Sequence, residues 1–162
     1  MSADNQQERL DANWIVGFTD GEGCFHISIN KLHGMKLGWQ VLPEFRIVQH
    51  EKDESTLYRI KEYFNFGDVK INRIDFHGTR KEFRVRGLDN LNQIIKFFNK
   101  YKLNTSKRKD FEIFSEVISL MNKKEHLTKE GLTKIAKLIS QMNRKPISKY
   151  LESSETTRSS VI

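Results

Sequence analysis

The sequence predicts an α+β fold whose helices and strands follow in the order α-β-β-α-β-β-α-α-α. Two observations support this fold class. Apolar residues recur at helical spacing in five segments, whereas four other segments alternate between apolar and polar residues. The four alternating segments come in two pairs, and each pair is interrupted by a glycine-containing turn, which is typical of hairpins.

The chain of 162 residues is long enough for one domain with a proper core. We expect that domain at residues 11–145, after an N-terminal extension at 1–10. The segment 146–162 is rich in Ser and Thr and has few apolar residues, so we expect a mobile tail there.

The first helix is expected at residues 11–21, with Asp11 as its N-cap. From residue 24 the period changes to two, and after a turn at 31–38 the alternation resumes. The intervening positions are polar, so this first hairpin has one polar face. The side chains expected to face inward are Phe25, Ile27, Ile29, Val41, Phe45 and Ile47.

A second helix is expected from Asp53, interpreted as its N-cap, to about Asn65. A second hairpin with a turn at 77–79 follows, and its opposite face is polar. Its inward side chains are expected to be Val69, Ile71, Phe83 and Val85. Three helices complete the chain, and their expected N-caps are Asp89, then Thr105 or Ser106, then Thr128.

Composition restricts the class of partner. Lys and Arg number 28 against 21 acids, and the net charge of +7 favours a polyanionic partner. The single cysteine, Cys24, excludes an internal disulfide and a Cys-rich zinc site. No apolar run is long enough for a bilayer and the N-terminus lacks a secretory h-region, so we expect no membrane partner. Frequent Lys, Asn, Ile and Phe suggest an AT-rich coding genome, such as that of a chloroplast or mitochondrion, with the protein used in the same compartment.

Residues 14–23, WIVGFTDGEG, form the most informative segment. Gly17 and Gly21 lie about one helical turn apart, and the apolar run ends in Asp20 and Glu22. Two such helices that cross at their glycines approach closely, because no Cβ separates their backbones. Their terminal carboxylates would then meet and could hold a divalent metal. Taken alone, an ordinary helix end with a glycine stop explains the segment about as well.

This segment resembles the motif that names the LAGLIDADG homing endonucleases, with Ile15, Gly17, Phe18, Asp20, Gly21, Glu22 and Gly23 at matching positions. The order of elements also resembles that family over roughly residues 11–118. The resemblance implies the LAGLIDADG fold, a saddle of four antiparallel strands backed by helices, with extra C-terminal helices. Monomeric members carry two motifs, so one copy implies a C2 homodimer. Its interface would be formed by Trp14, Gly17, Phe18 and Gly21.

The resemblance also implies three catalytic residues. Glu22 and its dimer mate would bind divalent metal directly, with the Gly21 carbonyl as a further ligand. Gln49, at the end of the second strand, would position the water or orient the carboxylate pocket. Lys107, at the basic start of the fourth helix, would project into the active site, and Lys109 is the fallback.

Plainer interpretations remain open for several of these residues. A Gln at a strand end can be a polar terminator, and a Lys-Arg-Lys run is usually a solvated helix start. We interpret Asp20 as a structural acid that holds backbone at the helix end. Some single-motif members have a second basic residue four positions after the glutamine, where this chain has Asp53, with Lys52 as the nearest substitute.

The polar faces of the strands predict base readout, because a two-stranded ribbon fits the major groove and alternate side chains meet successive base pairs. Arg can read guanine, Asn and Gln adenine, and Glu can accept from cytosine. The alternative is an ordinary solvated sheet face. The residues predicted to contact DNA are His26, Ser28, Asn30, Gln40, Glu44, Arg46, Lys70, Asn72, Arg80, Glu82 and Arg84.

The resemblance therefore implies a homodimeric, intron-encoded endonuclease that hydrolyses double-stranded DNA at a long pseudo-palindromic site and leaves 3′ overhangs. The expected cofactor is Mg²⁺, with Mn²⁺ as a substitute and Ca²⁺ binding without turnover, and no small-molecule cofactor is expected. Two alternatives are an intron RNA maturase and a non-enzymatic DNA-binding regulator on the same fold. The joint presence of Glu22, Gln49 and Lys107 argues against both.

Overall fold

The computed structural model describes residues 9–142 and 148–153, and the predictions for residues 1–8, 143–147 and 154–162 lie outside this part. The order of elements confirms the predicted α+β fold. Two short 3₁₀ turns, Glu51–Asp53 and Glu125–Leu127, precede α2 and α5. The main elements are α1 (Ala12–Glu22), β1 (Gly23–Lys31), β2 (Trp39–His50), α2 (Glu54–Phe64), β3 (Asp68–Asp75), β4 (Gly78–Val85), α3 (Leu88–Lys100), α4 (Lys107–Asn122) and α5 (Lys129–Ser140).

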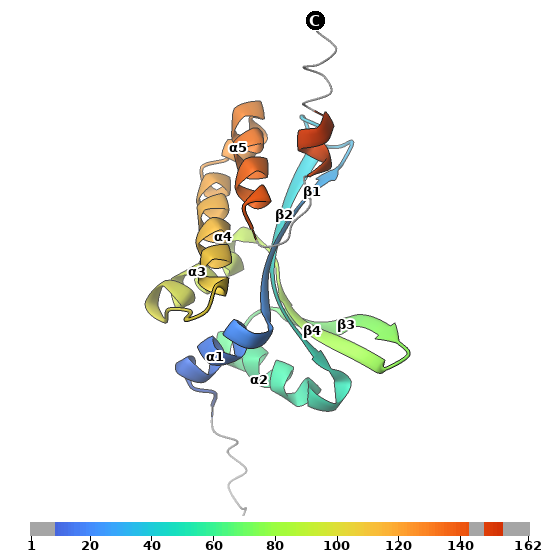
Figure 1. The fold of residues 1–162 in the computed structure, drawn as a ribbon, viewed down its shortest axis with the longest axis vertical. Coiled ribbons are helices and arrows are strands. Elements are labelled where there is room, and N and C mark those ends of the chain that lie inside the picture. Colours follow the sequence, from blue (N-terminus) through green and yellow to red (C-terminus); the bar gives the residue numbers. More distant parts are fainter. Residues whose placement is uncertain (1–8, 143–147, 154–162) are drawn as a thin grey trace, which may run out of the picture.

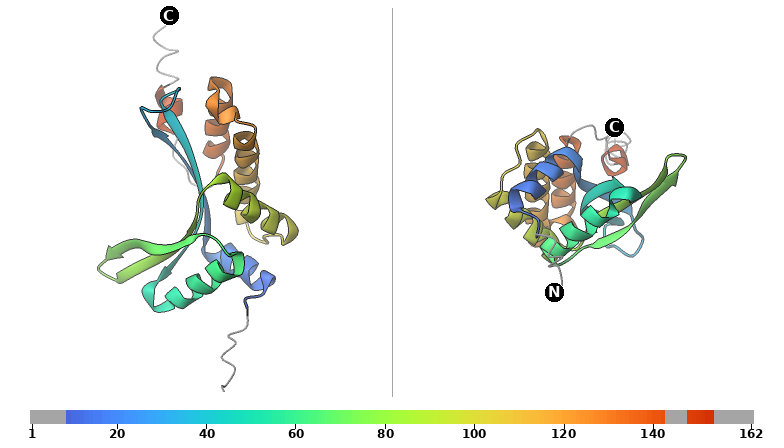
Figure 2. Two further views of the ribbon diagram at one scale, coloured as in Figure 1. Left: turned by 180° about the vertical axis from the view of Figure 1, so that it is seen from behind. Right: turned by 90° about the horizontal axis from the view of Figure 1, so that it is seen from below.

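The four strands form one antiparallel sheet in the order β1-β2-β4-β3. Strands β1 and β2 make a long arm, and the β3–β4 hairpin bends away from it, which gives the sheet a strongly curved shape (Figure 1). Helices α3, α4 and α5 lie along the arm, while α1 and α2 lie near the bend (Figures 1 and 2). This curved sheet is the expected saddle.

The core lies between the sheet and the helices. The Phe25 ring packs against the rings of Phe45, Phe98, Phe111 and Phe114, with centroids 5.1–5.6 Å apart. This cluster joins β1 and β2 to α3 and α4, and burial of such large apolar side chains is the main stabilising term. Five of the six predicted inward positions of the first hairpin are confirmed by the burial of Phe25, Ile27, Val41, Phe45 and Ile47, and the sixth, Ile29, is half-buried against the core.

The β3–β4 hairpin differs from the prediction at one inward position. Ile71 is 55% exposed, whereas Phe83 and Val85 on β4 are fully buried. The tip of this hairpin projects beyond the helices (Figure 2), so alternating apolar residues there have nothing to pack against. Ile74 and Phe76, nearer the tip, are 73% and 100% exposed.

Two of the predicted N-caps are confirmed. The Asp11 side chain accepts a hydrogen bond from Asn13 N at 2.8 Å, and Thr128 caps α5 by accepting from Gly131 N at 3.1 Å. Such bonds satisfy backbone donors that have no partner inside the helix.

Two further predicted N-caps, Asp53 and Ser106, lie at the N-cap position but make no side-chain capping bond, and the prediction of Asp89 is wrong. Asp53 directly precedes α2, but its side chain makes no capping bond, because a 3₁₀ turn capped by His50 already leads into the helix. The residue before α3 is Gly87 at φ 86°, which places Asp89 inside the first turn. Ser106 precedes α4 and its side chain makes no capping bond, although Thr105 Oγ1 accepts from Lys107 N at 3.3 Å.

Part of the segment expected to be a mobile tail is packed on the fold. Residues 149–153 are helical, and Tyr150 is buried. Its hydroxyl is 2.8 Å from Thr133 Oγ1 on α5, and its ring meets the Trp39 ring edge-on at 5.5 Å. None of the helices in the described residues has the length and hydropathy needed to cross a membrane.

Candidate active site and nucleic-acid interface

Helix α1 has two faces of different character. Ile15, Val16 and Thr19 are buried against the rest of the chain. The positions at the spacing 14, 17, 18 and 21 form the other face, where Trp14 is 40% exposed and stacks on Phe18 at 4.8 Å. Gly17 and Gly21 are exposed, and a Cβ built on either would meet no atom within 4 Å. This open stripe is flat and apolar.

The junction of α1 and β1 requires glycine. Gly23 N donates to the Thr19 carbonyl, which ends the helix. A Cβ on Gly23 would lie 2.6 Å from Thr19 Cγ2 and 2.9 Å from the Thr19 oxygen, too close for any other residue without backbone movement. The close approach fixes Glu22, the last residue of α1, as an exposed carboxylate at the junction.

Asp20 has the structural role that its plainer interpretation predicts. Its carboxylate accepts hydrogen bonds from Asn104 N at 2.9 Å, Thr105 N at 3.2 Å and Thr105 Oγ1 at 2.8 Å. Burial alone would raise the pKa of Asp20, but the hydrogen bonds from Asn104 and Thr105 outweigh it and lower that pKa. Asp20 therefore holds the α3–α4 connection against the end of α1.

The three residues expected to be catalytic lie at the same end of the sheet. Gly23 pairs with Ile47 in the β1–β2 register, so Gln49, two residues further on β2, extends past the start of β1 toward the end of α1. The Lys107 ammonium donates to the Gly23 carbonyl, next to Glu22. Their roles stay predictions, but the end of α1, the end of β2 and the start of α4 place all three at this end of the sheet.

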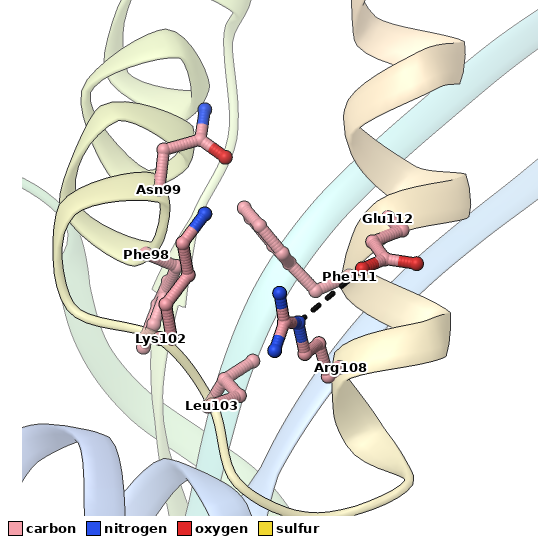
Figure 3. Close-up of a pocket in the computed structure, with 7 residues that line it drawn as sticks. All are labelled: Phe98, Asn99, Lys102, Leu103, Arg108, Phe111 and Glu112. Atoms are coloured by element: carbon pink, nitrogen blue, oxygen red, sulfur yellow. Dashed lines mark ion pairs between the residues drawn. The ribbon is translucent and has the colours of Figure 1, made fainter.

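The two lysines at the start of α4 differ in environment. Lys107 is half-buried and tied to Gly23, whereas Lys109 is exposed. Arg108, between them, forms an ion pair with Glu112 at 3.3 Å, beside a small cavity that Figure 3 shows at the α3–α4 connection. At about 50 Å³ this cavity has room only for a few water molecules. Of the two lysines, Lys107 is therefore the one directed toward the candidate site.

The described residues of one chain offer few metal ligands at this corner. No group of three His, Cys, Asp or Glu side chains among them is arranged to hold a metal ion. Because Asp20 is committed to the backbone of residues 104 and 105, Glu22 is the carboxylate at this corner that remains exposed. A metal bound here needs further ligands from a second domain, from water or from a bound substrate.

A row of cationic side chains crosses the polar face of the sheet. Arg46 on β2 lies directly opposite Arg84 on β4, and Lys70 on β3 lies opposite Glu82. Residues opposed in an antiparallel pair share a face. His26 faces Glu44 in the β1–β2 pair, which continues the polar face to the edge strand.

The two glutamates on this face differ from the prediction. Glu44 and Glu82 were expected to project outward as base readers, but they are only 4% and 3% exposed. Glu44 is paired with Arg46 and Arg86, and Glu82 with Arg84 and Asn72. Longer cationic side chains cover the shorter carboxylates, and alternation alone cannot reveal such pairing.

One cationic residue of the polar face was missed from the sequence. The register of β3 shifts between Ile71 and Arg73, so Arg73 lies opposite Arg80 although strict alternation places Asn72 on that face. Such a bulge puts two successive residues against one partner. The sequence of β3 does not predict this bulge, because the bulge depends on how β3 pairs with β4.

Known proteins resemble this chain over most of its length. A family model described as LAGLIDADG endonuclease matches residues 15–118. The chain is 40% identical over 136 residues to the probable intron-encoded endonuclease 2 of Neurospora crassa, a match covering 83% of this chain and 29% of that protein. The chain spans between 24% and 29% of the length of three of the curated relatives that it matches.

Solved structures show the same fold. The homing endonuclease I-TnaI has a TM-score of 0.84 and 41% identity, with 92% of this chain and 99% of that chain covered. I-SmaMI, bound to an uncleaved DNA target in the presence of calcium, has a TM-score of 0.82 and 33% identity. That match covers 91% of this chain and 49% of that chain.

Proposed function

This chain belongs to the LAGLIDADG endonuclease family, and we propose that it is a site-specific homing endonuclease that hydrolyses double-stranded DNA as a homodimer. One observation carries the proposal: Lys107 is bonded to the residue that follows Glu22, at the end of a helix whose other face is open. The catalytic groups thus lie at the edge of the open stripe, where a second domain would meet them.

The open stripe of α1 supports the dimer. Trp14, Gly17, Phe18 and Gly21 form a flat apolar surface, and exposed apolar surface of this kind marks an interaction site. Two copies of α1 that cross at the glycines bring the two Glu22 carboxylates together, because each follows directly after Gly21. In I-SmaMI, this chain matches about half of one longer chain, which is consistent with a pair of such domains.

The donor set fits magnesium in a shared site. Mg²⁺ binds through one or two carboxylates and keeps waters or phosphate oxygens for its other positions, which matches one Glu22 from each copy and the Gly21 carbonyl. When bound, the metal supplies a more acidic water and stabilises charge on the phosphate oxygens. Mn²⁺ would serve as a substitute, and Ca²⁺ would bind without turnover.

Lys107 and Gln49 are proposed to take the remaining catalytic roles. The Lys107 ammonium, held at the Gly23 carbonyl, is placed to stabilise negative charge that develops on the scissile phosphate. The Gln49 amide, at the end of β2, would orient the attacking water or the Glu22 carboxylate. Asp20 acts through the backbone, because it holds the segment that leads into Lys107.

The polar face of the curved sheet is proposed as the DNA-binding surface. Its side chains alternate along β1, β2 and β4 and would enter the major groove of each half-site. Two such faces related by a dyad span roughly two helical turns, so the target is long and pseudo-palindromic. The residues proposed to contact DNA are His26, Ser28, Asn30, Gln40, Arg46, Lys70, Asn72, Arg73, Arg80 and Arg84.

The biological setting is part of the same proposal. One relative is named as intron-encoded, and the frequent Lys, Asn, Ile and Phe of this chain fit an AT-rich organelle genome. We propose that the protein is encoded by an intron of a chloroplast or mitochondrion, acts there, and leaves 3′ overhangs.

The test is cleavage of a plasmid library that carries randomised inserts, with sequencing of the cut ends. The wild type with Mg²⁺ is expected to cut a narrow set of inserts and leave 3′ overhangs, and Glu22→Gln to cut none while still binding them in Ca²⁺. The matched control, Glu62→Gln on an exposed surface of α2, is expected to cut like the wild type. Cleavage by Glu22→Gln at the wild-type rate would refute the active site. Specific binding without any cleavage by the wild type would indicate a DNA-binding regulator. Splicing activity that survives the Glu22→Gln substitution would indicate a maturase.

A further inference from the structure

Two carboxylates lie beneath the arginines of the polar sheet face, and we propose that Glu44 and Glu82 position the side chains that read DNA bases and do not read bases themselves. The inference rests on the proposed function, because it takes this face as the DNA-binding surface. It changes the role expected for both glutamates, which their residue type alone suggests as acceptors for cytosine.

Glu44 lies between two arginines. Its Oε2 accepts a hydrogen bond from Arg86 Nε at 2.7 Å, and its Oε1 forms an ion pair with Arg46 Nε at 3.3 Å. The Glu44 side chain is 6% exposed, against 26% for Arg46 and 44% for Arg86. The two guanidinium groups therefore cover the carboxylate, and a cytosine could reach it only by displacing one of them.

Glu82 has the equivalent position one strand further. Its Oε1 forms an ion pair with Arg84 Nη1 at 3.4 Å, and its Oε2 accepts a hydrogen bond from Asn72 Nδ2 at 2.9 Å. Its side chain is 3% exposed, and that of Arg84 is 19% exposed. The bond to Asn72 uses one amide N–H and leaves the other N–H and the amide oxygen, which are the two groups that pair with adenine.

The charges explain why carboxylates are needed here. Arg46 and Arg84 are directly opposed on β2 and β4, and like charges in this position repel each other. One glutamate beside each arginine offsets that repulsion. Water could otherwise screen the two arginine charges from each other, but the burial of both carboxylates shows that little water reaches this part of the face.

Holding an arginine in place also changes what it can recognise. A mobile arginine binds any phosphate, whereas one paired with a fixed carboxylate presents its remaining guanidinium N–H groups in a set direction, as a contact to guanine requires. Glu44 pairs with Arg46 and Arg86 through Nε, and Glu82 pairs with Arg84 through Nη1, so each arginine keeps at least one terminal nitrogen free of its glutamate. A side chain ordered before binding also loses less conformational entropy when DNA arrives. Glu44 and Glu82 are therefore expected to increase selectivity among sequences more than affinity for DNA.

The experiment compares Glu44→Gln and Glu82→Gln with Glu116→Gln, which removes the same charge from an exposed position on α4. Each variant selects from a pool of randomised duplexes in Ca²⁺, and the bound sequences are counted. Glu44→Gln and Glu82→Gln are expected to bind the unselected pool at least as tightly as the wild type, and to lose about tenfold in discrimination at several neighbouring base pairs. Glu116→Gln is expected to keep the wild-type preferences.

Two outcomes would overturn the inference. If Glu44→Gln lost preference only for a single cytosine, Glu44 would be a base reader. If both variants selected the same sequences as Glu116→Gln, the carboxylates would have no positioning role.

A measurement on the free wild type separates this inference from the proposed function and does not depend on the folding of any variant. The Nε–H groups of Arg84 and Arg86 are expected to be more ordered in ¹⁵N relaxation than that of Arg108, whose ion pair with Glu112 lies on the surface of α4. Equal mobility of all three would refute positioning. If the wild type selected no sequences at all, the proposed function would fail, and the ordering of the arginines would still be measured.

Discussion

The Asp20 carboxylate accepts hydrogen bonds from both the backbone N–H and the hydroxyl of Thr105, at 3.2 and 2.8 Å. These bonds cross from the last turn of α1 to the segment that enters α4, 85 residues later in the chain. Because Lys107 lies two residues beyond Thr105, the same contacts hold the backbone from which its side chain reaches the Gly23 carbonyl, next to Glu22. Asp20 thus links the helix that carries the candidate metal ligand to the helix that carries the candidate catalytic cation.

Asp20→Asn is expected to reduce stability and cleavage together. The amide keeps one oxygen acceptor but places an NH₂ group against backbone donors, so we expect a loss of about 1–3 kcal/mol in the free energy of unfolding. Urea unfolding measures this loss, with Glu62→Gln as the control for removal of a surface charge. An unfolding midpoint equal to that of the wild type would show that the Asp20 contacts contribute nothing.

The lowered pKa of Asp20 also predicts how stability depends on pH. Hydrogen bonds to the ionised form stabilise the folded state at all pH values above the usual aspartate pKa of 3.8. The unfolded chain binds the proton first as the pH falls, so this stabilisation is lost as the pH drops from there through the lowered pKa of the folded protein. The difference in unfolding free energy between wild type and Asp20→Asn is expected to be constant above about pH 5 and to shrink below it. A difference that stays unchanged down to the acid transition would contradict the lowered pKa.

Gly23→Ala is expected to destabilise the protomer. The added Cβ would lie 2.9 Å from the Thr19 carbonyl oxygen, and that atom belongs to the helix backbone and cannot move aside. We expect a cost of about 1–3 kcal/mol, as for other overpacked sites, and a displaced Glu22. Thermal unfolding and the cleavage assay check both effects, and a variant with full stability and activity would show that the junction can yield.

Gly17→Ala provides the opposite case on the same helix. Its Cβ would meet no atom of the chain, and alanine favours helix by about 1 kcal/mol over glycine, so protomer stability is expected to stay equal or rise. In the proposed dimer the same methyl group separates the two copies of α1. Sedimentation equilibrium is expected to show at least a tenfold weaker dimer, and unchanged association would exclude the stripe around Gly17 as the interface.

Local patterns predict those elements in which neighbouring residues decide the structure. The first hairpin follows from alternation because both of its strands lie against helices, as the full burial of Phe45 and Ile47 shows. Alternation fails at Ile71 because the tip of the second hairpin has no helix beneath it. It also fails at Arg73, because a shift in register depends on the partner strand and leaves no trace in the sequence of its own strand.

In the candidate site, too, features set by neighbouring residues could be predicted and features set by distant residues could not. Glu22 could be proposed as a metal ligand because its motif is contiguous, whereas the contact between Lys107 and Gly23 joins residues 84 positions apart. Asp89 has a good N-cap residue type, but Gly87 at φ 86° starts the helix earlier, so residue type alone gives the wrong position. Tyr150 follows a segment with few apolar residues, and only the approach of Trp39 and Thr133 gives it a place in the core.

Lys107→Met is expected to lower the rate of DNA cleavage about a hundredfold while DNA binding in Ca²⁺ stays nearly unchanged, because a positioned cation acts on charge that develops only in the transition state. Lys109→Met removes the same charge from the same turn of α4, but its side chain is exposed and is not tied to Gly23. Single-turnover cleavage of the selected insert measures both variants, and thermal unfolding shows whether loss of the bond to Gly23 also weakens the fold. A slow Lys109→Met and a fast Lys107→Met would transfer the catalytic role to Lys109. If both variants lost DNA binding equally, the two lysines would act only as contacts to DNA phosphates, because a general electrostatic contribution does not distinguish the two positions.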